Sequence, residues 1–215
     1  TVKVNHVFGV PLIHVRQRLM PVWQKVIKRV FDITFSSLFL LLGSPLYLFT
    51  AIMVKFSSKG PIFYKQVRIG KNGTPFNIIK FRSMFVDSES KGPALSSDND
   101  PRITGWGRFM RKTRLDELPQ FINVIIGDMS VVGPRPERQF FIDQIVLKAP
   151  YYKHLLKVRP GITSLGQVKY GYAENVDEMV RRLKYDILYI ENMTLAMDFR
   201  IILFTVLIVV QGRGK

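Results

Sequence analysis

The sequence contains no cysteine among its 215 residues. This absence excludes a disulfide framework, a thiolate metal site and a cysteine nucleophile. Histidine is scarce as well, and His6, His14 and His154 are too scattered along the chain to predict a histidine metal site. The lack of cysteine fits a protein that works on the cytoplasmic side of a membrane.

Two glycine-rich motifs of nucleotide-binding proteins are also missing. There is no Walker loop, which argues against an ordinary P-loop NTPase. Gly105-Trp106-Gly107 is too short to be the dinucleotide fingerprint, which needs G-x-G-x-x-G after a strand. No cleavable signal peptide is visible at the start of the sequence.

Acidic residues are few compared with basic ones. Sixteen Asp and Glu stand against 32 Lys and Arg, which gives a formal net charge of +16. Hydrophobic residues nevertheless make up 47% of the chain. So much positive charge predicts polyanionic partners, which leaves nucleic acid, an anionic membrane surface or phosphorylated substrates as alternatives.

One long apolar segment, Val30–Phe56, is long enough to cross a bilayer as a helix. Basic residues flank it on both sides: Lys25, Lys28 and Arg29 before it, Lys55 and Lys59 after it. Since basic residues prefer the cytoplasmic side, both ends favour the same side. Pro45, in Gly43-Ser44-Pro45, predicts a kink near the middle. We therefore predict a re-entrant helix hairpin; a straight span that tolerates the proline is the alternative.

A second apolar segment, Leu195–Val210, contains an uninterrupted run that is too short to span a membrane, and it predicts an interfacial or core helix. Thr1–Gln17 is strand-rich in character. We accordingly divide the chain into a linker or tail of a further N-terminal module (1–22), a re-entrant membrane helix (23–60) and a cytoplasmic catalytic domain with an interfacial C-terminal helix (61–215).

The segment between these apolar stretches predicts an α+β fold that is mostly helical. Two β-prone runs flank Lys71-Asn72-Gly73, which is a strong signal for a β-hairpin. Phe85–Asp100 is rich in Ser, Asp, Gly and Pro and predicts a loop. An apolar stripe at helical spacing predicts a helix packed on the core: Val176, Met179, Val180, Leu183, Ile187 and Ile190.

Asp116 and Glu117 form the most promising chemical pair. A helical pattern follows them and is expected to stop at Gly127, with Pro119 in its first turn. The pair thus lies at or just before a helix N-terminus, after three basic residues. Both features predict ionised carboxylates with lowered pKa values.

An ionised carboxylate is a candidate nucleophile toward phosphorus, because the attack gives an acyl phosphate. Repulsion from a diphosphate would require a hard cation such as Mg²⁺, which takes carboxylate and phosphate oxygens. Two adjacent carboxylates can divide these roles, one attacking and one holding metal. For an acidic pair taken alone, the alternative is helix capping with no chemistry.

Further basic residues in stiff surroundings strengthen the case for phosphate binding. Arg135 and Arg159 each precede or follow proline in a turn, and a rigid turn lowers the entropic cost of aiming a bidentate guanidinium. Taken singly, each turn is as compatible with a solvated surface. The candidate phosphate-binding residues are Lys80, Arg82, Arg111, Arg135 and Arg159.

From about Trp23 to its end, the sequence resembles the bacterial sugar transferases, the monotopic phosphoglycosyl transferases. The resemblance rests on several motifs in the order of the family: KRVFD, Ser44-Pro45, KFRSM, DPRIT, LDELPQ, NVIIGDMSVVGPRP and VRPGIT. Two departures stand out, since Ser164-Leu165 follows VRPGIT where Gly-Trp is frequent, and Arg114 occupies a position that is often Ser. The first bears on sugar specificity more than on chemistry.

The resemblance implies an enzyme that transfers a sugar 1-phosphate from a UDP-sugar to polyprenyl phosphate and releases UMP. It implies Asp116 as the nucleophile of a ping-pong reaction and Glu117 as the ligand of Mg²⁺. It implies Lys80, Arg111, Arg135 and Arg159 as basic residues around the phosphates. It also implies a location at the bacterial inner membrane, with the active site on the cytoplasmic face, and a role at the start of exopolysaccharide, capsule or O-antigen synthesis.

Two other classes of protein remain as alternatives. A non-catalytic, basic membrane-surface module that binds lipid would explain the charge and the apolar segment, but not Asp116-Glu117 among basic residues. A nucleic-acid-binding domain would have to bury Val30–Phe56, so we expect no nucleic acid partner. The expected partners are a UDP-sugar, polyprenyl phosphate and membrane lipid, and the sequence leaves a homodimer open.

Overall fold

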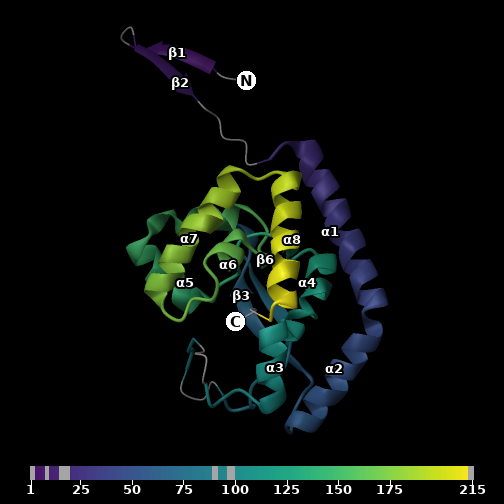
Figure 1. Cartoon of the computed structure of the whole chain (residues 1–215). Helices are drawn as coiled ribbons and strands as arrows, with labels where there is room; N and C mark the ends of the chain where they lie inside the picture. Colours follow the sequence, from purple (N-terminus) through teal and green to yellow (C-terminus); the bar gives the residue numbers. More distant parts are fainter. Residues whose placement is uncertain (1–2, 8–9, 15–19, 89–91, 96–99, 213–215) are drawn as a thin grey trace.

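The computed structural model describes residues 3–7, 10–14, 20–88, 92–95 and 100–212 (Figure 1). Within them the chain is α+β and mainly helical, as predicted. The α-helices are α1 (Val22–Leu42), α2 (Ser44–Ser57), α3 (Gly105–Thr113), α4 (Gln120–Ile126), α5 (Gln139–Lys148), α6 (Leu165–Lys169), α7 (Val176–Glu191) and α8 (Leu195–Val210). Short 3₁₀ helices are η1 (Lys71–Gly73), η2 (Leu115–Glu117) and η3 (Pro150–Lys157).

The strands of the described residues form three two-stranded sheets. They are β1 (Lys3–Val7) with β2 (Val10–His14), β3 (Phe63–Ile69) with β4 (Pro75–Phe81), and β5 (Ser130–Val132) with β6 (Gly161–Thr163). The first two pairs are antiparallel and the third is parallel. The predicted hairpin around Asn72-Gly73 is confirmed, and Asn72 takes the left-handed conformation (φ 58°) that such a turn favours.

The apolar segment Val30–Phe56 folds as part of two helices, α1 and α2, that meet at a bend of 65°. Gly43 joins them and Pro45 lies in the first turn of α2, so the predicted kink is confirmed. The pair lies against the body of the molecule (Figure 1). The rings of Phe39 and Phe121 are 4.4 Å apart, which packs the end of α1 on α4.

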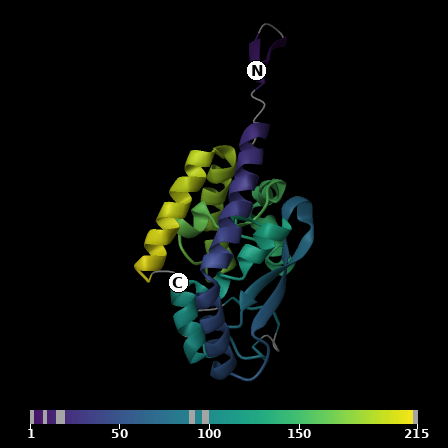
Figure 2. The ribbon, with the colours of Figure 1, turned by 90° about the vertical axis from the view of Figure 1, so that its right-hand side faces the viewer.

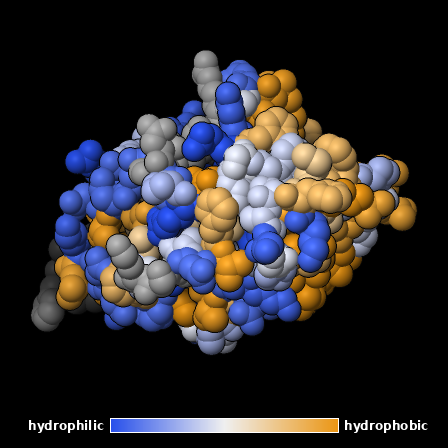
Figure 3. All heavy atoms as spheres, turned by 90° about the horizontal axis from the view of Figure 1, so that it is seen from below, coloured by the Kyte–Doolittle hydropathy of each residue, from blue (hydrophilic) through white to orange (hydrophobic). Residues whose placement is uncertain are grey.

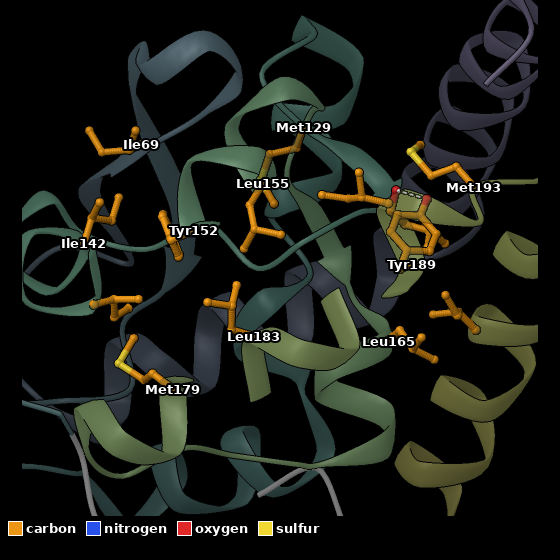
Figure 4. Close-up of a cluster of buried hydrophobic side chains, with 14 of the residues drawn as sticks. Ile69, Met129, Ile142, Tyr152, Leu155, Leu165, Met179, Leu183, Tyr189 and Met193 are labelled. Atoms are coloured by element: carbon orange, nitrogen blue, oxygen red, sulfur yellow. Dashed lines mark hydrogen bonds between the residues drawn. The ribbon is translucent and has the colours of Figure 1, made fainter. Parts of the chain in front are cut away.

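The core lies between α4, α5, η3, α7 and the two central sheets. Figure 4 shows Tyr152, Leu155, Leu183 and Met179 meeting in its interior. The predicted apolar stripe of α7 is confirmed, because the helix buries Met179, Leu183 and Ile190.

A buried polar cluster connects α1 to β5 and α8. The ammonium of Lys28 donates to Asp198 of α8 at 2.7 Å and to the Val132 carbonyl at 3.0 Å. Asp32 accepts from the Ser130 hydroxyl at 2.7 Å and from the Val131 amide at 3.1 Å. The hydroxyl of Tyr189 donates to Asp198 at 2.6 Å. In this cluster, the buried carboxylates of α1 and α8 are each held by several donors.

Large apolar side chains remain exposed along α1, α2 and α8. Figure 2 looks onto the face across which α1 runs, with α8 on one side and the β3–β4 hairpin on the other. In Figure 3, hydrophobic residues gather on the side of the molecule that carries α1 and α2. Among the described residues, no helix is by itself long and apolar enough for a membrane crossing, and only the bent α1–α2 pair meets that criterion jointly.

Candidate active site

The Asp116-Glu117 pair lies in a tight turn between α3 and α4. The hydroxyl of Thr104 caps α3 by accepting from the Gly107 amide at 2.9 Å. Helix α3 ends at Arg114, a non-glycine residue with φ 57°, which redirects the chain into η2. Helix α4 follows, and it ends at Gly127 (φ 111°) as predicted. Strain at Arg114 is of the kind that recurs at functional sites.

Strand β4 and the loop after β5 bring cations to Glu117. The ammonium of Lys80 donates to Glu117 Oε1 at 2.8 Å, and Arg135 approaches the same oxygen at 3.5 Å. Arg114 donates to Oε2 at 3.0 Å. The Glu117 side chain is only 8% exposed, which strengthens these interactions relative to a surface pair. Three cations thus neutralise one buried carboxylate.

Asp116 is equally buried but less well compensated. In the part of the chain that the structure describes, its carboxylate accepts no hydrogen bond. The charges of Lys80, Arg111 and Arg114 still act on it, and it lines an open cavity. An uncommitted carboxylate beside a cavity is what an attack on a bound phosphorus would require.

The two carboxylates have opposite pKa shifts. Burial, and then the neighbouring Glu117 carboxylate, raise the pKa of Asp116 against the effect of its cations. Burial alone would raise the pKa of Glu117 too, but Lys80, Arg135 and Arg114 outweigh it and hold this pKa well below its usual range. The lowered pKa predicted from the sequence is therefore confirmed for Glu117 and wrong for Asp116, because the nearby cations outweigh burial at Glu117 and do not outweigh burial and the neighbouring carboxylate at Asp116.

A cavity of about 320 Å³ opens beside the pair and is lined by Asp116, Lys80, Arg82, Arg111 and Arg135. A smaller recess of about 60 Å³ adjoins the two carboxylates and shares most of these cations. The structure thus brings four of the five predicted phosphate-binding residues to one cavity.

Arg159 lies elsewhere. Its Nε donates to the Gly127 carbonyl at 2.9 Å, and it lines a separate pocket of about 130 Å³ beside Lys25 and Lys71. The structure does not bring it together with Asp116 and Glu117 in the cavity.

Several residues of the cavity were not singled out from the sequence. They are Tyr64, Arg68, Arg102, Arg138 and Tyr172. Arg68 bonds Glu137 Oε2 at 3.3 Å, and Arg182 bonds Glu137 Oε1 at 2.5 Å, so a buried ion-pair chain supports this wall. The alternation of side chains along β3 and β4 would have placed Arg68 on the same face as Lys80.

The pair also offers the donor set that Mg²⁺ prefers. Magnesium is usually held by one or two carboxylates, together with waters and substrate phosphates. Among the described residues there is no group of three or more acidic, histidine or cysteine side chains for a metal, so a cage of protein ligands alone is not formed there. Each carboxylate oxygen has two lone pairs, so Glu117 Oε2 keeps one beside its bond from Arg114. These residues fit a magnesium ion that arrives with a phosphate.

Comparison with known proteins gives consistent matches. The family model described as bacterial sugar transferase matches residues 23–212. A UDP-N-acetylgalactosamine-undecaprenyl-phosphate N-acetylgalactosaminephosphotransferase of Aeromonas hydrophila is 43% identical over 188 residues, which are 87% of this chain and 44% of that protein. A UDP-glucose:undecaprenyl-phosphate glucose-1-phosphate transferase of Klebsiella pneumoniae is 41% identical over 206 residues, 95% of this chain and 44% of that protein.

A shorter relative matches over nearly its whole length. The exopolysaccharide production protein PSS of Rhizobium leguminosarum is 39% identical over 199 residues, which are 88% of this chain and 98% of that protein. The chain therefore spans less than half the length of the first two relatives and almost all of the third.

Proposed function

Because this chain belongs to the bacterial sugar transferase family, we propose that it transfers a sugar 1-phosphate from a UDP-sugar to polyprenyl phosphate, such as undecaprenyl phosphate. The products are polyprenyl-diphosphate sugar and UMP. The observation that carries this proposal is the buried Asp116, uncommitted to any hydrogen bond among the described residues, beside a cavity lined by cations. This arrangement favours phosphoryl chemistry over mere lipid binding.

The first step forms a covalent intermediate. An oxygen of Asp116 attacks the phosphorus that carries the sugar, and the bond from this phosphorus to the oxygen bridging to UMP breaks. UMP leaves with that oxygen, and the enzyme carries an aspartyl phosphosugar. Arg111 and Arg135 lie where they would stabilise the charge of the phosphoryl oxygens during this step.

Glu117 serves as the magnesium ligand in this proposal. A bound Mg²⁺ would neutralise charge on the diphosphate and so lower its repulsion from Asp116. Lys80 and Arg114 keep Glu117 ionised, since both lower its pKa, and an ionised carboxylate is the form that binds metal.

We place the protein at the bacterial inner membrane with its active site on the cytoplasmic face. The exposed apolar side chains of α1, α2 and α8 support this, as does the position of Tyr47. Its hydroxyl donates to the carbonyl of Leu118, so α2 contacts the segment that holds Asp116 and Glu117. The proposed role is the first membrane step in the synthesis of exopolysaccharide, capsule or O-antigen.

Membrane topology has its own test in this cysteine-free chain. Gln24, in the first turn of α1, and Ser58, the residue after α2, lie near the two ends of the pair, and single cysteines there can be probed with an impermeant thiol reagent. A re-entrant pair leaves both unlabelled in sealed, right-side-out vesicles until the membrane is opened. Labelling of one site alone in sealed vesicles would show that the segment crosses the membrane.

The activity is tested by UMP release. Purified protein should release UMP from UDP-glucose or UDP-N-acetylgalactosamine only when undecaprenyl phosphate and Mg²⁺ are both present in catalytic turnover. A panel of UDP-sugars then identifies the donor. Absence of UMP release from every donor, with protein that is folded and binds anionic vesicles, would favour the lipid-binding module instead.

A further inference from the structure

Arg82 has a buried guanidinium with unused hydrogen-bond donors. The residue is only 5% exposed, and its Nη2 donates to the Ser58 carbonyl at 2.6 Å. Its Nε and Nη1 have no partner in the part of the chain that the structure describes. Burying charged donors without partners is costly, so such a group in the wall of a cavity indicates an anionic ligand.

The surroundings hold this guanidinium in place. The Arg82 amide donates to the Ile62 carbonyl at 2.9 Å, which continues the pairing of β4 beyond its last residue. Gly60 provides the space, since a Cβ atom added there would lie 2.1 Å from Arg82 Nη1. The side chain is thus fixed between the end of α2 and the β3–β4 hairpin.

Arg82 lies near the reaction centre but apart from it. It follows Lys80 by two residues, so both side chains leave the same face of the extended chain, about 7 Å apart along the strand. Lys80 is engaged by Glu117, whereas Arg82 lines the same cavity with no acidic partner among the described residues. The cavity therefore offers one position for an anion at Arg82, in addition to the position beside Asp116.

Apolar side chains share the cavity wall with Arg82. Pro61, Phe63, Phe85 and Val86 line the cavity, and the last three are exposed. Phe56, which is 83% exposed, lies near the end of α2, just before Ser58, whose carbonyl accepts from Arg82. A ligand that binds here would place its anionic group at Arg82 and an apolar portion against these side chains. A lipid phosphate has both parts, whereas a nucleotide lacks the apolar portion.

We propose that Arg82 binds the phosphate of the polyprenyl phosphate acceptor, and that the apolar side chains beside it contact the first units of the lipid. This inference rests on the proposed function and assigns Arg82 to the second half of the reaction. An oxygen of the lipid phosphate attacks the phosphorus of the aspartyl phosphosugar. A phosphorus–oxygen bond to the lipid forms while the bond to Asp116 breaks, and Asp116 leaves as a carboxylate. With the lipid phosphate as dianion, no proton is gained or lost.

The two half-reactions can be measured separately. Exchange of labelled UMP into the UDP-sugar, without lipid, reports the first half alone. Transfer to undecaprenyl phosphate reports both. Arg82→Gln removes the charge, and Arg82→Lys keeps the charge but loses the planar fork. Arg181→Gln, on the exposed part of α7, is a control for the loss of one positive charge.

In Arg82→Gln we expect UMP exchange within about twofold of the parent protein. We expect the KM for undecaprenyl phosphate to rise about 10- to 100-fold, as for a lost hydrogen bond to a charged group. The KM of Arg82→Lys for undecaprenyl phosphate should lie between the values of the parent protein and Arg82→Gln. Arg181→Gln should match the parent in both assays. The retained exchange also shows that the variants are folded.

Two results for the variant would overturn the inference. Equal losses of exchange and transfer would assign Arg82 to the donor or to the fold, and unchanged transfer would show that it serves neither substrate. A parent protein that shows neither exchange nor transfer gives a different outcome from these two, because it would overturn the proposed function and this inference with it.

Discussion

The molecule contains two buried groups of charge that look alike in composition and differ in use. One joins Lys28 to Asp32 and Asp198, and the other joins Lys80 to Asp116 and Glu117. In the first, both carboxylates accept hydrogen bonds from protein donors. In the second, Glu117 takes the close cation contacts and Asp116 is left beside a cavity.

This difference separates a structural ion pair from a reactive one. Several protein donors to Asp32 and Asp198 fix α1 against β5 and α8. The pocket that Asp32 lines is about 130 Å³, smaller than the cavity of about 320 Å³ beside Asp116. At Asp116, incomplete compensation is what keeps the carboxylate available to a substrate. Substitution of Asp116 should therefore abolish turnover, whereas substitutions in the cluster of Lys28, Asp32 and Asp198 should mainly reduce the stability of the fold.

The largest expected effect is on turnover. Asp116→Asn keeps the size of the side chain but removes the nucleophile, so we expect UMP release to fall at least about a thousandfold. Asp32→Asn is the matched variant in the structural cluster, and its folded fraction should keep turnover within a few-fold of the parent. Steady-state UMP release measures both, and near-normal turnover in Asp116→Asn would remove its assigned role.

The second effect is on stability. Lys28→Met leaves Asp32 and Asp198 buried without their shared cation, and breaking such a pair typically costs about 3–5 kcal/mol of the free energy of unfolding. Lys80→Met should cost less, about 1–2 kcal/mol, because Glu117 keeps Arg114 and Arg135. Urea unfolding in detergent compares the two. A greater loss in Lys80→Met would reverse the distinction between the clusters.

A third comparison concerns two arginines that the sequence predicted alike. Arg135→Lys should reduce transition-state stabilisation by about 1–3 kcal/mol, since it loses the planar fork at the cavity. The structure places Arg159 in another pocket, so we now expect Arg159→Lys to change kcat/KM by less than about 0.5 kcal/mol. Equal losses would show that the second pocket takes part in the reaction.

The smallest expected effect is on pH dependence. Asp116 must be ionised to attack, so the rate should fall as the pH drops through its raised pKa. Arg114 lowers the pKa of both carboxylates, so Arg114→Ser should move the acid limb of the UMP exchange rate to higher pH. Lys112→Ser, on the exposed side of α3, should leave the limb in place. A limb that moves to lower pH in Arg114→Ser would contradict this electrostatic account.

Local signals made much of the fold predictable. Asn72-Gly73 specifies its hairpin through backbone conformations that few residues adopt. Pro45 breaks the helical hydrogen-bond pattern whatever the helix packs against. The stripe of α7 and the stop at Gly127 are equally local. Such features depend on neighbours in sequence, so the sequence alone was enough.

The site was predictable in its residues but not in its electrostatics. Lys80, Arg111 and Arg135 were recognised by type and setting, and they do meet at the Asp116-Glu117 pair. The direction of the Asp116 pKa shift depends on burial and on which carboxylate the cations contact, and sequence spacing encodes neither. The same holds for Arg159, which the sequence could not assign to one pocket or the other.

The central claim is that Asp116 carries the sugar phosphate during the reaction. Intact-protein mass spectrometry tests it after incubation with the UDP-sugar that the protein accepts, in the absence of undecaprenyl phosphate. The account predicts a mass increase equal to one phosphosugar, located by proteolysis to the peptide with Asp116, absent in Asp116→Asn and removed when undecaprenyl phosphate is added. An active protein that shows no adduct, or an adduct on another residue, would contradict it.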